Sequence, residues 1–405
     1  MCTTTSNPLS KQSGDAPAVK HSDDHPVMKG SLVPPPGVPA MNFSPGPTNL
    51  PASVEAEVKK LFDNERMCSM YLSHRSPEFV DILAETNRLA RETMQIPDNY
   101  EILFMHGGGH GQFAAVPMNL CAKKEDKVTY LVNGTWSKRA AEEARKFATP
   151  VVVSSENEDG TFTSNPSFEN IDMDSKYIYL CSNETVNGIE MHRLPKLGAD
   201  SPPLVIDASS DFSTKPIEWA ESNVGVLYAC ASKNIGHPGL TMVVIRNDLI
   251  GNQQPICPGV FCYKTNVEGC NLWNTIPTFN VEVVGIVMKW VIAQGGVDEM
   301  EKRSIAKSTM VYNLVDNSNG FYSTPLQDKS IRSRMNVPFD IAGGDDEITK
   351  EFLVEAWEQG ILGLRTLTPF GVGKYLRASL YNGVSVENTE KLVAFMEKFM
   401  KSKQN

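Results

Sequence analysis

The sequence contains no apolar run of the length that a transmembrane helix needs, so we expect no membrane partner. It is also short of basic residues: 38 Lys and Arg stand against 48 Asp and Glu, which gives a net charge of −10. A nucleic-acid partner would require a basic face, and the acidic balance argues against one. With 405 residues, 41% hydrophobic and 21% charged, the chain is long enough to bury a large core and form more than one domain.

The eight cysteines contain no CxxC pair and are scattered along the chain. This usage is typical of reduced thiols and predicts neither a disulfide framework nor a metal site. His106 and His110 have i, i+4 spacing, but three glycines separate them and no third ligand is nearby, so we expect no metal there. We expect a cytoplasmic protein, although an organelle address in the N-terminal segment stays open.

Four segments are predicted from composition and periodicity. Residues 1–40 are rich in Ser, Thr, Pro, Asp and Lys, which predicts a disordered tail that ends in a proline-rich linker. Residues 51–300 alternate helix-like and strand-like patterns, which predicts a large α/β domain with a mostly parallel sheet. Residues 301–405 form a smaller α/β domain, and the short segment 41–50 lies between the tail and the large domain.

The patterns predict individual elements as well. The expected helices cover residues 54–63, 77–94, 300–314 and 386–400. The expected strands, seven in the large domain, cover residues 101–105, 127–132, 150–153, 176–181, 204–206, 224–231 and 240–246.

Lys233 follows the apolar run 224–231, which is typical of a buried strand. Burial disfavours an ammonium group and lowers the pKa of a lysine, and a free amine can form a Schiff base. A solvated lysine that caps the strand is the alternative, and taken alone it is the commoner case. Two features upstream favour the reactive amine.

The first feature is Asp207, which follows the strand-like run 204–206. A carboxylate at one strand end and a lysine after the next strand suit pyridoxal phosphate, because this cofactor needs an anion at its pyridine nitrogen to act as an electron sink. The alternative is an aspartate that caps a turn or helix, which the following Ser209 and Ser210 would also permit.

The second feature is the glycine-rich stretch 106–111, which follows one predicted strand and leads into a helix-like run. A glycine loop before a helix N-terminus binds anions such as phosphate, because backbone N–H groups and the helix dipole face the ligand. Residues 109–114 also fit the dinucleotide fingerprint loosely, which leaves an NAD-dependent oxidoreductase as a weaker alternative. That alternative is disfavoured because the next strand ends at Asn133 rather than at an acid for the ribose.

At these residues the chain resembles the phosphoserine aminotransferases, a family of class V, fold-type I pyridoxal phosphate enzymes. The resemblance covers about Met41 to the C-terminus. The matching stretches, in order, are 42–47 (NFSPGP), 73–79 (SHRSPEF), 106–111, 134–137 (GTWS), 183–188 (NETVNG), 233–236 (KNIG), 239–241, 274–278 (NTIPT), 333–339 and 377–382.

The resemblance implies a homodimer with active sites at the interface and a segment 41–50 that packs with the small domain. Its reaction would be reversible amino transfer between glutamate and 3-phosphohydroxypyruvate, in serine biosynthesis. Lys233 would form the Schiff base, Asp207 would bind the pyridinium, Trp136 would stack on the ring and Thr185 would bind the ring hydroxyl.

The remaining implied roles concern anionic groups. The cofactor phosphate would be held by Gly109, His110 and Ser232, and by Asn274 and Thr275 from the other subunit. The substrate would be held by Arg377 at its α-carboxylate, a task that suits the guanidinium fork. His74 and Arg75 of the partner subunit would bind the substrate phosphate.

Three positions depart from the family pattern. Ser232 stands where the family usually has Gln, and His110 where it often has Arg. A His-Arg pair expected shortly before Arg377 is missing, and only Arg365 or Lys374 is available to replace its charge. Two alternatives therefore stay open: an aminotransferase of this fold with a different amino acid substrate, and a non-catalytic paralogue.

Overall fold

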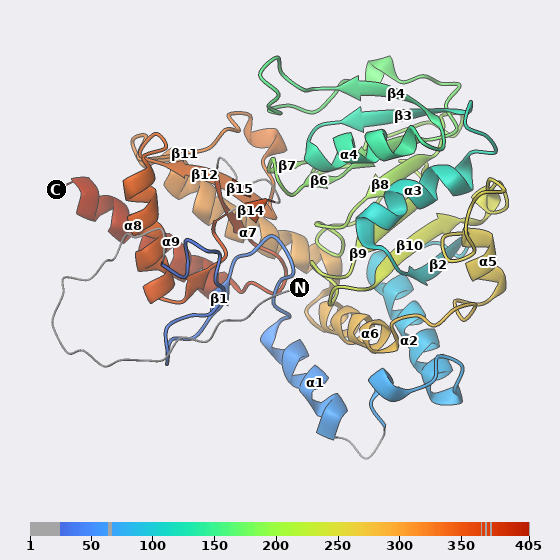
Figure 1. Ribbon diagram of the computed structural model, residues 1–405, viewed down its shortest axis with the longest axis horizontal. Helices are drawn as coiled ribbons and strands as arrows, with labels where there is room; N and C mark the ends of the chain where they lie inside the picture. The colour runs from blue at the N-terminus through green and yellow to red at the C-terminus, as the bar shows by residue number, and fades with distance from the viewer. Residues whose placement is uncertain (1–24, 64–66, 366, 369–370, 373–374, 405) are drawn as a thin grey trace, which may run out of the picture.

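The computed structural model describes residues 25–63, 67–365, 367–368, 371–372 and 375–404 (Figure 1). Its central element is a seven-stranded sheet in the order β2-β10-β9-β8-β5-β3-β4. Strand β10 is antiparallel to both of its neighbours, and the other pairings are parallel. The strands are β2 (Tyr100–Met105), β3 (Lys127–Val132), β4 (Thr149–Ser154), β5 (Ile178–Cys181), β8 (Leu204–Asp207), β9 (Val224–Cys230) and β10 (Thr241–Arg246).

Helices cover both faces of this sheet (Figure 1). Alternate strand residues belong to two different cores; for example, Leu204 and Ile206 face one core and Val205 the other. The first core includes residues of α1 (Ala52–Asp63), α2 (Pro77–Met94) and α6 (Thr278–Ala293). The second includes residues of α3 (Gly108–Leu120), α4 (Thr135–Ala144) and α5 (Tyr263–Glu268). The predicted α/β class with a mostly parallel sheet is confirmed.

A smaller lobe packs around a third core (Figure 1). Its three-stranded sheet has the order β11-β12-β16, with β11 (Tyr322–Ser323), β12 (Asn336–Ile341) and β16 (Leu376–Ser379). Helices α8 (Asp346–Glu358) and α9 (Val386–Gln404) pack on it. Helix α7 (Gly296–Asp316) joins the lobes, since its Met300 lies in the first core and its Val311 in the third. A boundary at residue 300 thus falls inside one helix.

The chain before α1 packs on the small lobe. Strand β1 (Met41–Asn42) pairs in parallel with β13 (Ile361–Leu362), and Phe43 is buried in the third core. Residues 25–40 differ from the tail expected over 1–40, because Val27 and Met28 are buried in the same core and Val33 O accepts a hydrogen bond of 2.7 Å from the Trp357 indole. This part of the segment is ordered because its apolar side chains are buried against the small lobe. Residues 1–24 lie outside the described residues.

Local signals explain where helix α2 begins. Helix α2 covers the predicted residues 77–94: the Ser76 side chain accepts a hydrogen bond from Phe79 N, and Pro77 occupies the first turn. No helix within the described ranges is both long and apolar enough to span a bilayer.

Candidate active site

The carboxyl ends of the parallel strands meet at one edge of the large sheet, where a cavity of about 120 Å³ opens. Asp207 is the last residue of β8, and Lys233 lies three residues beyond β9. Ligands of open α/β sheets bind at this edge. The lining residues include seven that the sequence analysis selected: Gly109, His110, Trp136, Thr185, Asp207, Ser232 and Lys233.

Asp207 is 5% exposed and is held by donors on both carboxylate oxygens. Ser209 N donates to Oδ1 at 2.9 Å, and the Tyr228 hydroxyl donates to Oδ2 at 3.2 Å. Burial raises the pKa of Asp207, while these hydrogen bonds and the charge of Lys233 oppose that shift. The carboxylate is therefore fixed in direction and faces the cavity as an acceptor for a cationic ring N–H.

Lys233 is partly buried and contacts two hydroxyl groups. Its Nζ donates to Thr185 Oγ1 at 3.3 Å and to the Tyr381 hydroxyl at 3.4 Å. The backbone of Gly46 passes so close that a Cβ there would lie 3.0 Å from the lysine side chain, at a φ of +127°. Glycine at position 46 thus gives the lysine room to enter the cavity.

The glycine loop builds an anion site beside these two groups. Gly107, with φ of +95°, is the N-cap of α3, and Gly109 and His110 of the first turn line the cavity. Backbone N–H groups at a helix N-terminus are suited to bind an anion. A Cβ on Gly109 would lie 3.6 Å from Cys230 Sγ and 3.8 Å from Asp207 Oδ2, so this glycine brings the start of α3 close to the buried carboxylate. The hydroxyls of Ser209 and Ser232 also line the cavity.

Trp136, in the first turn of α4, closes one side of the cavity. The imidazole of His110 meets its ring edge-on at a centroid distance of 5.6 Å, and the Arg139 guanidinium lies 5.2 Å from its centroid. An indole fixed between such neighbours offers a flat surface to an aromatic ligand.

Arg377 lies next to the cavity and is 5% exposed. It comes from β16, and its guanidinium donates a hydrogen bond of 2.6 Å to Thr185 O, while its Nε is buried without a partner. Burial lowers the pKa of Arg377, and no ion pair with a carboxylate is found for it among the described residues. The side chain lines a second space of about 400 Å³, where an incoming carboxylate would satisfy it.

The four residues assigned to the partner's site lie away from both spaces. Two Arg75 hydrogen bonds reach Leu272 O and Trp273 O, at 3.3 and 3.4 Å, so Arg75 sits beside Asn274 and Thr275. The His106 ring nitrogen Nε2 lies 3.0 Å from Thr275 O, which attaches this segment to the glycine loop. His74 is buried next to Arg75, and its Nε2 has no partner.

The residues around the first cavity fit pyridoxal phosphate. A phosphate needs N–H donors and hydroxyls, which the start of α3, Ser209 and Ser232 supply. A pyridinium needs a buried carboxylate, which Asp207 supplies, and an aldehyde needs an amine, which Lys233 supplies. This donor set matches the cofactor group by group.

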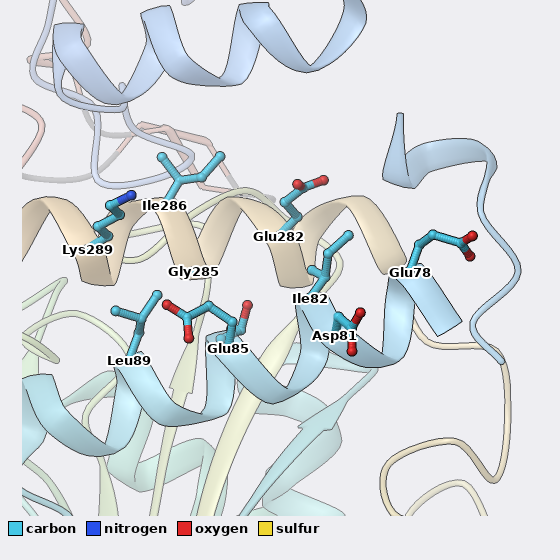
Figure 2. Close-up of a pocket in the computed structure, with 10 residues that line it drawn as sticks. Glu78, Asp81, Ile82, Glu85, Leu89, Glu282, Gly285, Ile286 and Lys289 are labelled. Carbon is cyan, nitrogen blue, oxygen red and sulfur yellow. The ribbon is translucent and has the colours of Figure 1, made fainter. Parts of the chain in front are cut away.

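In a third cavity, of about 490 Å³ between α2 and α6, the charged side chains are mainly acidic. Figure 2 shows the carboxylates of Glu78, Asp81, Glu85 and Glu282 around it, with Lys289 as the cationic side chain. Like charges repel, so this acidic surface disfavours anionic amino acids and phosphates. It does not compete with the first cavity as a site for them.

Sequence reasoning missed several residues of the site. Glu184 is fully buried and receives three hydrogen bonds from α4, and the Tyr228 hydroxyl donates to Asp207 Oδ2. Their partners are distant along the chain, so local patterns assign them no role, although Glu184 lies in the matching stretch 183–188. Arg365, considered as a substitute for the missing pair, instead donates a 2.9 Å hydrogen bond to Met28 O. Lys374 lies outside the described residues.

Comparison with known proteins agrees with this geometry. The family model described as Aminotransferase class-V matches residues 40–392. The chain belongs to the class-V aminotransferase family. The resemblance seen in the sequence is thereby confirmed, and so is the expectation that the chain is a transaminating enzyme.

Individual members of this family are similar over nearly the whole chain. A probable phosphoserine aminotransferase of Caenorhabditis elegans is 42% identical over 369 residues, which cover 89% of this chain and 97% of the relative. The phosphoserine aminotransferase of Drosophila melanogaster is 40% identical over 90% of this chain and 100% of its own length. The solved phosphoserine aminotransferase of Bacillus circulans superposes with a TM-score of 0.83 at 32% identity, covering 90% of this chain and 99% of that one.

Proposed function

We propose that this class-V aminotransferase is a phosphoserine aminotransferase that uses pyridoxal phosphate. It transfers an amino group between glutamate and 3-phosphohydroxypyruvate, in serine biosynthesis. The observation that carries the proposal is the convergence of Lys233, Asp207 and Arg377: the first two face one cavity, and Thr185 links both Lys233 and Arg377. The curated relatives and the solved structures with this name support the same substrate.

Each residue has a defined task. When bound, pyridoxal phosphate supplies an electrophilic carbon and an electron sink for the substrate's Cα. The Lys233 amine would take the proton from the substrate's Cα as a base and then, as an acid, deliver it to the electrophilic carbon on the other side of the substrate nitrogen. Asp207 keeps the ring nitrogen protonated, and Trp136 fixes the plane of the ring. The Thr185 hydroxyl donates a hydrogen bond to the ring hydroxyl. Arg377 orients the amino acid substrate by binding its α-carboxylate.

In a homodimer, residues of both subunits would bind the phosphate groups of the cofactor and the substrate. Gly109, His110 and Ser232 bind the cofactor phosphate of their own subunit, and Asn274 and Thr275 reach the partner's. His74 and Arg75 bind the substrate phosphate in the partner's site. These four residues line neither the cavity at Asp207 nor the one at Arg377, which supports a role for them in the partner's site.

The alternatives are less well supported. A different amino acid substrate was considered because the His-Arg pair is absent, and Arg365 is engaged with Met28. The names of the relatives nevertheless favour phosphoserine. A non-catalytic paralogue or an NAD-dependent enzyme has no use for a lysine placed opposite a buried carboxylate in one cavity.

We place the protein in the cytoplasm. The seven described cysteines are free thiols, four of them buried, which is typical of a reducing compartment. Two relatives from Arabidopsis thaliana are named chloroplastic, so location differs within the family.

Replacing the proposed Schiff-base lysine tests the function. Lys233→Ala removes the amine, so turnover should fall by at least a thousand-fold and the lysine-bound absorbance of added pyridoxal phosphate should vanish, with an unchanged far-ultraviolet circular dichroism spectrum. Lys196→Ala, at an exposed lysine paired with Glu221, is the control and should match the unsubstituted protein. Appreciable turnover in folded Lys233→Ala would contradict the assignment.

A further inference from the structure

The N-terminus of helix α4 is bound by side chains from another part of the chain. The residue before the helix is Gly134, which has no side chain to cap the free N–H groups. Thr135 N donates to Asn187 Oδ1 at 2.9 Å. Trp136 N donates to Glu184 Oε2 at 2.9 Å, and Ser137 N to Glu184 Oε1 at 2.7 Å. Three successive helix donors are therefore satisfied by one short turn.

That turn connects β6 (Asn183–Glu184) to β7 (Ile189–Glu190), immediately after β5. Glu184 is 0% exposed and has no ion pair among the residues the structure describes. The N–H groups of the helix, and its dipole, are what stabilise its charge. Burial raises the pKa of Glu184 to about 7, although the hydrogen bonds from Ser137 and Trp136 oppose that shift. A buried carboxylate this costly is expected to have a role.

The fit between turn and helix leaves no spare space. A Cβ on Gly134 would lie 2.5 Å from Glu184 Cδ, so only glycine allows the carboxylate to approach the helix. The Ser137 hydroxyl adds a further hydrogen bond of 2.7 Å to Glu184 Oε1. The contact fixes both the position and the direction of the first turn, and Trp136 is in that turn.

The same turn holds the other parts of the site. Thr185, next to Glu184, accepts from Lys233 Nζ with its hydroxyl and from Arg377 with its carbonyl. We propose that Glu184, assisted by Asn187, is a positioning residue that sets the Trp136 ring against the cofactor and keeps it in register with Lys233 and Arg377. The inference rests on the proposed function, since it concerns the residues that hold pyridoxal phosphate.

Binding of pyridoxal phosphate to purified apoprotein tests this role without relying on turnover. In Glu184→Gln one oxygen becomes an NH₂ group that faces a helix donor, so we expect the dissociation constant to rise about ten-fold and the circular dichroism of the bound cofactor's visible band to weaken at saturation. Asn187→Ala is a milder variant and should raise the constant about three-fold. Glu156→Gln removes an exposed carboxylate that pairs with Lys138 on the same helix and should change neither value.

A double-mutant cycle separates positioning of the ring from a general loss of structure. If Glu184 acts through Trp136, adding Glu184→Gln to Trp136→Ala should change the dissociation constant by less than two-fold. An equal ten-fold loss in both backgrounds would overturn the proposal, and so would unchanged affinity and unchanged circular dichroism in folded Glu184→Gln. Lys233→Ala in the same titration reports on the proposed function separately, because a visible band that does not depend on Lys233 would refute that function whatever Glu184 does.

Discussion

At the scale of the residue, Asp207 is held on its buried side by a chain of contacts between tyrosines. Tyr228 donates to its carboxylate, and the Tyr179 hydroxyl lies 2.8 Å from that of Tyr228. Tyr130 stacks on Tyr179 at a centroid distance of 4.6 Å. Burial raises the pKa of each of these tyrosines, so they stay neutral and act as donors.

This arrangement predicts the effect of Tyr228→Phe. Without the hydroxyl donor, the pKa of the Asp207 carboxyl should rise further and its charge should weaken as a partner of the ring nitrogen. We expect about a ten-fold loss of pyridoxal phosphate affinity at neutral pH, because a carboxyl with a raised pKa is less ionised there. The affinity should partly recover as the pH rises and the carboxyl of the variant becomes ionised. Titration of apoprotein at several pH values measures this. Affinity equal to that of the unsubstituted protein at every pH would contradict it.

The sequence identifies only part of this residue network. Lys233 and Asp207 could be selected because each follows a buried strand, and strand ends meet at one edge of a parallel sheet. Glu184 could not, since its partners in α4 are 47 and 48 residues away and form no local pattern. The role of a buried carboxylate depends on neighbours that only the fold brings together.

At the scale of the element, helix α7 holds the turn that follows β16. The Lys307 ammonium is 3% exposed and donates to three carbonyls, Leu380 O, Tyr381 O and Val384 O, at 2.7 to 2.9 Å. That turn carries Tyr381, whose hydroxyl contacts Lys233. The helix thus links the core of the small lobe to the reactive amine.

Lys307→Met should leave three buried carbonyls without donors. We expect a loss of roughly 2–4 kcal/mol in the free energy of unfolding, measured by denaturant titration of the apoprotein. Lys302→Met changes a lysine of the same helix that is 76% exposed and should cost less than about 0.5 kcal/mol. Equal stability of the two variants would show that the three hydrogen bonds contribute nothing.

Periodicity predicted the strands of the large sheet and the helices α1, α2, α7 and α9, whereas α4, α5, α6 and α8 were not predicted. All seven predicted strands are present, and strand β3 has the expected bounds, 127–132. Helix α6 was not predicted because its own side chains are apolar on nearly all sides, so its sequence shows no single apolar face. Helix α4 was not predicted because it begins after a glycine and its capping groups come from residues 184 and 187.

At the scale of the whole molecule, one surface carries both apolar side chains and residues assigned to the substrate. Met70, Tyr71 and Trp273 are 47%, 69% and 47% exposed, and Trp273 O accepts from Arg75. Exposed apolar and aromatic side chains beside polar residues are typical of an interface. This is the surface that we assign to the second subunit.

Hybrid dimers test that assignment. Lys233→Ala inactivates the site of its own subunit, whereas Arg75→Ala should inactivate the site of its partner. Mixing the two variants and refolding them together should restore up to about a quarter of the unsubstituted activity, because half of the dimers are hybrids and each hybrid keeps one intact site. A mixture no more active than the separate variants would place Arg75 in its own subunit's site or outside any site.

The central claim is that Lys233, Asp207 and Arg377 form a transaminating site for phosphoserine. The most direct measurement is a single half-reaction on protein reconstituted with pyridoxal phosphate, in which phosphoserine, glutamate, serine or alanine is added separately and the visible cofactor band is followed. We predict rapid conversion to the near-ultraviolet pyridoxamine phosphate band with phosphoserine and glutamate, and little with serine or alanine. Conversion by an unphosphorylated amino acid other than glutamate, without conversion by phosphoserine, would contradict the account.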